Sequence, residues 1–538
     1  MKKGRFLGVV VVLCALGFGG LVWAAENVAV VNGEPVILTD PSQAWDWYDM
    51  QVMYNLYSPL VYPRADGGID PHIAMTWTPV DGDLARWEFT IMAGYQFHDG
   101  TEITAEDVAW SANRYIALGG GSMAGVTSAT AKDFYTVEFV LAQPNAVFPE
   151  TLAYFYVLNK DLILENLEEG DHGELGDYGT AWLQINDAGS GPYMMVNHNA
   201  GVALEAARFE DYFLGWPATD NPDEVPIDRV IFMMEPEYST LMLMLKNREL
   251  DLEANGGWSL GQLEDISTLD GVHINYVWSE NVTTYLNATL PPTDDEHFRK
   301  AILYAFDYEA LMEPYVPYGA REGNVLLSAM AGYMPVEPQP RKKDLDKAWA
   351  ELALSKYADR LDEVRLVGHY CGGLTYEEDI LLQLQADMAE LGVKMEVAGP
   401  LWPQYSDECG NPDTTPNFTV WLFGPQSWPA HDFYTYQFYH GPNWIFSAHW
   451  YFEDAEIIRL LEQTRATEDL AARTALYEQL QPMIASHALA LYAYEKPKPY
   501  VSQNYLVGPL EQIEFIGPNV NMRNWQINLK LKDELTGK

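Results

Sequence analysis

Short alternations of apolar and polar residues recur along the chain and predict β-strands. The clearest candidates are Arg86 to Met92, Tyr135 to Leu141, Asp228 to Met234 and Val393 to Gly399. Several of them alternate as half-buried strands do. Amphipathic helical patterns separate these runs, and no fixed-period repeat interrupts them. The pattern therefore predicts a mixed α/β architecture with substantial sheet.

Helical spacing is clearest between Thr375 and Leu391. Four apolar positions fall on one predicted face: Ile380, Leu384, Met388 and Leu391. We expect Thr375 to cap this helix, with Glu378 completing a capping box, and Gly392 to end it. The following residues have a strand pattern. This helix-to-strand unit is typical of a layered α/β lobe.

The segment FHDGTEITAEDVAWS, residues 97–111, combines a turn with the start of a helix. His98, Asp99 and Gly100 form the predicted turn, and Thr104 is the expected N-cap with Asp107 at the third helical position. His98 and Asp99 could instead be an acid–base pair. A local turn explains them better, because Asp side chains commonly bond nearby backbone groups. The residue pattern of this segment is therefore explained by its local fold, and it requires no catalytic role.

The charge balance narrows the possible partners. The 538-residue chain has a formal net charge of −45, which argues against nucleic acid because nothing would neutralise its phosphates. Aromatic residues make up 13% of the chain, so extensive disorder is excluded. The length exceeds what one core supports and predicts two or three lobes.

The start of the chain has the three parts of a secretory signal peptide. A basic opening that ends at Arg5 precedes an uncharged apolar run from Phe6 to Trp23, and Ala24 and Ala25 follow. We expect residues 1–25 to be removed on export, which places the mature protein in the periplasm or elsewhere outside the cytoplasm. An uncleaved membrane anchor is the alternative.

Two cysteines, Cys371 and Cys409, lie beyond the signal. An even pair in an oxidising compartment predicts one disulfide, and two separate thiols are the alternative. No zinc-binding spacing surrounds them, and the nine-residue spacing of His431, His440 and His449 matches no metal motif. We expect neither a metal nor a cofactor.

Several segments, in order along the chain, together resemble one family. They are YSPLVY (57–62), IDPHIAMTW (69–77), FHDGTEITAEDVAWS (97–111), GSGPYMM (189–195), LKNRELDLE (245–253) and DEHFRKAILYAFDYEAL (295–311). The chain resembles the extracytoplasmic solute-binding proteins of ABC importers, in the group that binds peptides and oligopeptides. The resemblance implies an α/β, bilobed type II periplasmic binding protein fold with an additional inserted domain.

The resemblance also implies a division of the chain. Lobe I would combine residues 26–57, 189–278 and 500–538, the extra domain would be 58–188, and lobe II would be 279–499. Such a protein captures a small-molecule solute by lobe closure. It delivers the solute to ABC permease subunits, its only link to a membrane. ATP is hydrolysed by a separate subunit, and we expect the binding protein to be a monomer.

Residues 421–452 are rich in aromatic rings and lie where peptide-binding relatives carry an Asp that holds the peptide amino terminus. The corresponding residue here is Gln426, which lacks the charge that strengthens such a bond. Peptide binding therefore stands beside oligosaccharide binding, in which sugar rings stack on aromatic faces. The candidate ligand residues are Trp421, Gln426, Trp428, Trp45, Trp47, Tyr48, Asn255 and Trp258.

Two other function classes stay open. A secreted hydrolase is the enzymatic alternative, although 77 acidic residues make carboxylate pairs inevitable and uninformative. A holdase or a sensor-coupled receptor could also use the same fold.

Overall fold

The computed structural model describes residues 27–33, 36–44, 47–64, 68–235, 237–254, 258–328, 330–335, 342–423, 430–440, 454–508 and 520–537. The predicted signal peptide lies outside these ranges. In the described part of the chain, no helix combines the length and apolarity needed to cross a bilayer.

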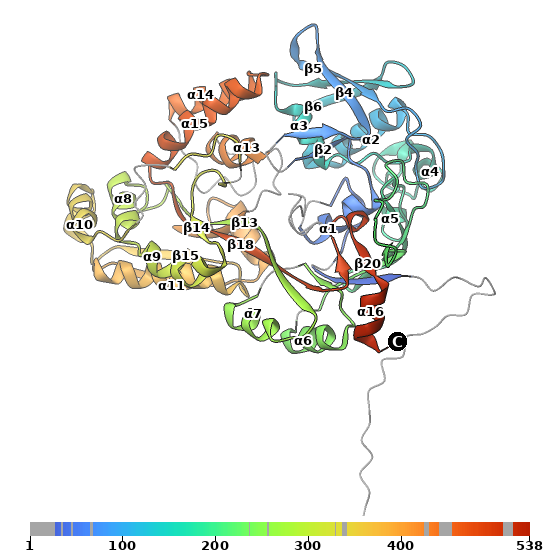
Figure 1. The fold of residues 1–538 in the computed structure, drawn as a ribbon. Helices are drawn as coiled ribbons and strands as arrows, with labels where there is room; N and C mark the ends of the chain where they lie inside the picture. The colour runs from blue at the N-terminus through green and yellow to red at the C-terminus, as the bar shows by residue number, and fades with distance from the viewer. Residues whose placement is uncertain are drawn as a thin grey trace, which may run out of the picture.

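One mixed sheet of eleven strands organises the molecule. In spatial order its strands are β16 (Lys394–Ala398), β15 (Arg365–His369), β17 (Phe418–Phe423), β13 (Val272–Leu286), β18 (Ala490–Gln503), β12 (Leu252–Glu253), β1 (Val28–Asn32), β11 (Arg229–Met233), β9 (Ala203–Arg208) and β8 (Tyr193–Asn199), with β14 (Arg321–Glu322) also paired to β18. The two long strands β13 and β18 are antiparallel and occupy the middle. They therefore join the β15–β17 end of the sheet to the β1–β12 end (Figure 1).

Helices lie around the large sheet on several sides. On one side of β13 and β18 in Figure 1 are α8 (Glu296–Ala305), α9 (Tyr308–Met312), α10 (Leu345–Leu354), α11 (Thr375–Glu390), α14 (Ala455–Arg465) and α15 (Leu470–Ser486). To the right of the β13 and β18 labels are α1 (Trp47–Leu56) and α16 (Leu529–Thr536), and below the two strands are α6 (Tyr238–Asn247) and α7 (Leu260–Ser267). The chain also forms α12 (Trp402–Gly410), α13 (Ala430–Asp432) and the π-helical turn η6 (Phe433–Gln437).

A separate four-stranded antiparallel sheet lies at the top of Figure 1. Its order is β4 (Ala74–Val80), β5 (Asp83–Ile91), β7 (Thr136–Leu141) and β6 (Val126–Ala131). The same part of the chain forms α2 (Ala105–Leu118), α3 (Phe148–Thr151), the short helix η2 (Leu152–Tyr154), α4 (Lys160–Leu164) and α5 (Thr180–Leu183). Two small sheets complete the fold: β2 (Val61–Pro63) with β3 (Ile69–Pro71), and β10 (Glu224–Pro226) with β20 (Gln526–Asn528) and β19 (Leu506–Val507).

The predicted strands and the predicted helix face are confirmed. The four candidate strands correspond to β5, β7, β11 and β16, and the four apolar positions of α11 are all buried. The predicted cap of α11 is wrong: Leu374 is the N-cap residue, it makes no side-chain cap bond, and Thr375 is already helical. The carboxylate of Glu377 instead bonds the chain before the helix, because its Oε2 accepts a hydrogen bond from Cys371 N at 2.9 Å.

The turn and cap between residues 97 and 111 are confirmed. Thr104 and Asp107 form a complete capping box at the start of α2. Asp99 accepts hydrogen bonds from the backbone and hydroxyl of Thr101, as a turn residue does. His98 pairs with Asp187, with Nδ1 2.6 Å from Oδ1, so His98 and Asp99 are not an acid–base pair.

The hydrophobic core is divided into clusters. One cluster joins side chains of the four-stranded sheet and α3, such as Phe89 and Phe148, to Tyr434 of η6 and Tyr477 of α15. A second lies around β1 and β11, and a third lies around β15 and α11. The first cluster means that the small sheet and the α13–α15 region bury apolar side chains against one another.

Candidate functional site

The strands β13 and β18 are weakly bonded to each other where they cross between the two ends of the sheet. Their register shifts between Tyr276 and Ser279. Pro499 lies opposite Tyr276 and Pro497 lies opposite Ser279. Because proline has no N–H, both positions lack a donor to the ladder. A register shift beside two prolines makes this crossing the natural place for the sheet to bend.

A buried charge cluster lies at the same point. Glu280 and Lys496 are paired in register, with Lys496 Nζ 3.0 Å from Glu280 Oε2. Lys498 Nζ lies 3.8 Å from the other oxygen of Glu280. The three side chains are 4%, 7% and 8% exposed. Two ammonium groups thus share one carboxylate in a place where dehydrating each ion costs several kcal/mol.

The first turn of α11 extends this cluster. Lys496 Nζ lies 4.6 Å from the centre of the Tyr376 ring, a cation–π distance. Burial raises the pKa of Glu377 to about 8, although the Cys371 amide and Lys496 act in the opposite direction. Glu377 therefore holds its proton at neutral pH. It brings a neutral carboxyl group close to Lys496.

Tyr434 connects the crossing to the rest of the molecule. Burial raises the pKa of Tyr434 well above its usual value, and the nearby groups Glu495, Glu280 and Tyr154 raise it further. Glu495, on β18, accepts hydrogen bonds from the backbone and hydroxyl of Ser328. Tyr154 follows α3 in the part of the chain that carries the small sheet. Side chains of β13, β18 and η6, together with Tyr154 from the segment beside the small sheet, therefore lie near one another at the β13–β18 crossing.

The sequence patterns did not single out this cluster. The available signal was the run YEKPKPY, residues 494–500, which places two lysines two residues apart in a long strand whose residues are otherwise mostly buried. Same-face lysines in a buried strand require partners. The partner Glu280 lies 216 residues away along the chain. Pattern analysis could not have identified it.

Two of the predicted ligand residues are described in full. Trp421, in β17, is 6% exposed, and its ring packs 5.2 Å from that of Tyr405. Trp258 donates from Nε1 to Glu253 Oε2 at 2.5 Å and makes an edge contact with Tyr238. Packing accounts for both rings, and their contact with ligand stays a prediction.

The other predicted ligand residues are not described at side-chain level. Trp45, Asn255, Gln426 and Trp428 lie outside the described residues. Trp47 and Tyr48 begin α1, but their side chains are not described. The candidate site therefore rests on the charges at the crossing.

Cys409 lies in α12 close to Cys371, and the disulfide between them stays a prediction. Burial raises the pKa of Cys409 well above its usual range, with a smaller contribution from the nearby Cys371. Among the described residues, no group of His, Cys, Asp and Glu side chains could hold a metal ion.

The sequence around Ser259 matches the G-x-S-x-G pattern of hydrolase nucleophile elbows. In the structure Ser259 is the N-cap of α7, and its hydroxyl accepts from Gln262 N while the Gln262 side chain accepts from Ser259 N. The hydroxyl thus serves a helix end. An elbow serine instead lies at a strand-to-helix turn beside a histidine base.

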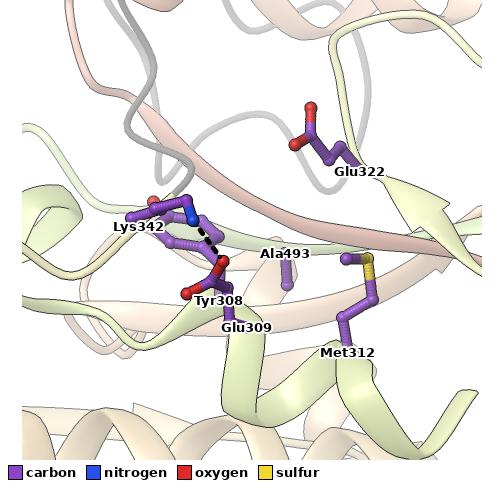
Figure 2. Close-up of a pocket in the computed structure, with 6 residues that line it drawn as sticks. All are labelled: Tyr308, Glu309, Met312, Glu322, Lys342 and Ala493. Carbon is purple, nitrogen blue, oxygen red and sulfur yellow. Dashed lines mark ion pairs between the residues drawn. The ribbon is translucent and has the colours of Figure 1, made fainter. Parts of the chain in front are cut away.

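A small surface pocket lies on another part of the β18 strand. Tyr308, Glu309, Met312, Glu322, Lys342 and Ala493 line it (Figure 2). Lys342 and Glu309 form an ion pair of 2.8 Å at its rim, with both side chains largely exposed. Its volume of about 70 Å³ is far below the roughly 300–1,000 Å³ of typical ligand pockets. It suits a few waters rather than a peptide.

Comparison with known proteins identifies relatives over nearly the whole chain. The family model for bacterial extracellular solute-binding proteins, family 5, middle region, matches residues 68–445. The probable D,D-dipeptide-binding periplasmic protein DdpA of Escherichia coli K12 is 25% identical over 470 residues, which cover 85% of this chain and 86% of DdpA.

Solved structures match the whole fold. The oligopeptide-binding protein AppA of Bacillus subtilis, in complex with a nonapeptide, superposes with a TM-score of 0.73 at 19% identity, over 93% of this chain and 99% of AppA. The periplasmic binding protein AgaA of A. tumefaciens R10, in complex with agropinic acid, gives the same TM-score, identity and coverage. The expected fold, an α/β type II periplasmic binding protein with additional small sheets, is confirmed.

Proposed function

The chain belongs to family 5 of the bacterial extracellular solute-binding proteins, and from that premise we propose that it encloses a charged, peptide-like solute at the β13–β18 crossing. The family consists of binding proteins rather than enzymes. The chain is thus a substrate-binding protein of an ABC transporter for peptides or similar solutes, and it acts outside the cytoplasm.

The proposed lobes are those expected from the sequence. Lobe I comprises residues 26–57, 189–278 and 500–538, lobe II comprises 279–499, and the inserted domain comprises 58–188. Both boundaries between the lobes fall inside the crossing, within β13 and β18. The cluster around β15 and α11 draws only on residues of the proposed lobe II. These two observations support a hinge at the crossing.

The buried charges at the crossing are the basis for choosing peptide-like solutes over oligosaccharides. Lys496, Lys498, Glu280 and Glu377 give the crossing both ammonium groups and carboxyl groups. A peptide has both an ammonium and a carboxylate, so it can pair with such groups when closure excludes water. A neutral oligosaccharide has no ionised group, so it gains no charge-assisted hydrogen bond from these side chains. We therefore place peptide-like solutes ahead of oligosaccharides.

The solutes of relatives agree with a charged ligand. DdpA is named for D,D-dipeptides, AppA was solved with a nonapeptide and AgaA with agropinic acid. We extend only their shared chemistry, a small solute with ionised groups, to this chain. We further propose export through cleavage after residue 24 or 25, action as a monomer, and delivery to permease subunits of the transporter.

The direct test begins with the compound that the protein carries through purification. The mature protein is denatured, and the released small molecules are identified by mass spectrometry. Calorimetric titration with a panel of dipeptides to nonapeptides, and with neutral oligosaccharides, then ranks the two classes. We expect a released peptide-like ion and tighter binding of a panel peptide. Tighter binding of a neutral sugar would overturn the choice of solute, and cleavage of the bound peptide would overturn the binding role.

A further inference from the structure

The segment that carries the small sheet is firmly bonded to the first part of the chain. Arg114 of α2 and Asp40 form a bidentate ion pair, with N–O distances of 2.8 and 2.6 Å, and both side chains are fully buried. Ser58 Oγ donates to Ser190 O at 2.9 Å. In the proposed division, these contacts join the inserted domain to lobe I, so the two would move as one body.

The opposite side of the inserted domain meets lobe II. Glu150 of α3 forms an ion pair with Arg473 of α15, 323 residues later in the chain. Their side chains are 11% and 6% exposed. Four residues before Glu150, Ala146 N donates to Arg465 O at the end of α14, at 2.6 Å. One short segment of the inserted domain thus contacts the corner between α14 and α15 twice.

The partner side of this contact is held in place within lobe II. Arg465 donates from Nε and Nη2 to the two carboxylate oxygens of Asp432, at 3.1 and 2.6 Å. Its guanidinium lies 3.4 Å from the centre of the Tyr436 ring. Arg473 Nη1 also donates to Thr467 O. These contacts all lie within lobe II and do not involve Glu150.

The same corner is connected to the candidate solute site. Asp432 ends α13, and the next turn, η6, carries Tyr434, which lies close to Glu280 and Glu495 at the crossing. Asp432, which holds Arg465, and Tyr434, which lies beside the candidate solute site, are two residues apart in one short helical segment. A solute that fixes Tyr434 would also fix the surface that receives the inserted domain.

We propose that Glu150 and Arg473 are a closure latch, an ion pair that forms when lobe II closes onto the inserted domain and breaks when the protein opens. This inference rests on the proposed function. Within lobe II, Arg473 is held by the Thr467 carbonyl, so the open form keeps a solvated, preordered receptor for Glu150. The latch stabilises the closed form whatever solute is enclosed, and it slows release more than it affects selectivity.

The test compares Glu150→Ala, Arg473→Ala and the double variant with wild type. The matched control is Glu456→Ala, which removes an exposed ion pair to Arg459 within α14. The probe is the tightest-binding peptide of the panel described above, and its dissociation rate is measured by stopped flow. Thermal unfolding is followed with and without that peptide.

We expect each latch variant to release the peptide about tenfold faster or more, with the double variant no faster than the singles. The control should match wild type, and melting without peptide should be unchanged. Wild-type dissociation rates in the variants would overturn the latch. An equal loss of melting temperature with and without peptide would show a permanent contact and also overturn it. A wild type that binds no panel peptide would contradict the proposed function instead.

A second arm needs no solute. In a variant with Cys371→Ser and Cys409→Ser, Glu150→Cys and Arg473→Cys are joined by a short bismaleimide, and scattering compares joined and unjoined protein. We expect the radius of gyration to fall on joining. Efficient joining with an unchanged radius would show that the two sites are always in contact, and would overturn the latch independently of any peptide.

Discussion

Lys496 and Glu280 face each other across β18 and β13, with Nζ 3.0 Å from Oε2, where these strands join the two ends of the large sheet. Pro497 and Pro499 flank the neighbouring lysine, and a register shift lies beside them. The backbone ladder therefore lacks donors close to the buried charges. In the proposed account, the same point is both the hinge and the floor of the solute site.

Replacing Glu280 with Gln tests the energetic weight of this cluster. The substitution leaves Lys496 and Lys498 buried without a shared carboxylate, so we expect a loss of about 3–5 kcal/mol in the free energy of unfolding. Urea denaturation measures it. The exposed pair of Glu456 and Arg459 supplies the control, because Glu456→Gln should change the value by only about 0.5 kcal/mol. Equal effects of the two substitutions would mean that the crossing charges are already solvated.

Lys498→Met tests whether the cluster recognises the solute. Loss of an ammonium group that pairs with a peptide carboxylate should weaken binding of the best panel peptide at least tenfold, about 1.4 kcal/mol. Calorimetric titration measures the change. Lys394→Met, on the exposed edge of β16, should leave the affinity unchanged. An unaltered titration for Lys498→Met would remove that residue from the solute site.

The raised pKa of Glu377 predicts a specific dependence of stability on pH. Burial raises its pKa from the ordinary 4.5 to about 8. The folded protein then holds a proton that the unfolded chain releases between these two values. The contribution of Glu377 to the free energy of unfolding therefore falls as pH rises through that window and levels off above it.

Glu377→Gln removes this titration, so its free energy of unfolding should decline less than that of wild type across the window. Urea denaturation in half-unit pH steps gives both curves. Glu396→Gln, at an exposed position of β16, should follow wild type. Parallel curves for wild type and Glu377→Gln would show that the carboxyl titrates normally.

The predicted aromatic contact is tested by Trp428→Ala. If this ring stacks on the solute, the substitution should weaken binding more than tenfold, about 1.4 kcal/mol, in a calorimetric titration. Trp349→Ala on the exposed face of α10 is the matched control. Identical curves for Trp428→Ala and wild type would exclude that ring from the site.

The features of the fold that the sequence predicted correctly depend on residues close together in the chain. The Thr104–Asp107 capping box and the buried face of α11 depend on residues three or four positions apart, so their patterns are complete within one helix. The cap of α11 differs from its pattern, because Thr375 is already helical and Leu374 is the N-cap residue. Glu377 is buried beside Cys371 and Lys496, and the helix begins without a side-chain cap.

The candidate site could not be predicted in the same way. Glu280 and Lys496 meet only because β13 and β18 pair in one particular register, and no local pattern fixes that register. Trp421 illustrates a second limit of sequence patterns. Its aromatic-rich surroundings predict a ligand face, and that contact stays a prediction. The structure adds that the ring is buried against Tyr405, which the sequence pattern could not give because large aromatic side chains also fill cores.

Small-angle scattering of the mature wild-type protein, without solute and then saturated with the tightest-binding panel peptide, tests the central claim most directly. The account predicts that the radius of gyration falls on saturation and returns to its starting value when the intact peptide is dialysed away. Identical scattering curves at a saturation established by calorimetry would contradict closure around a solute.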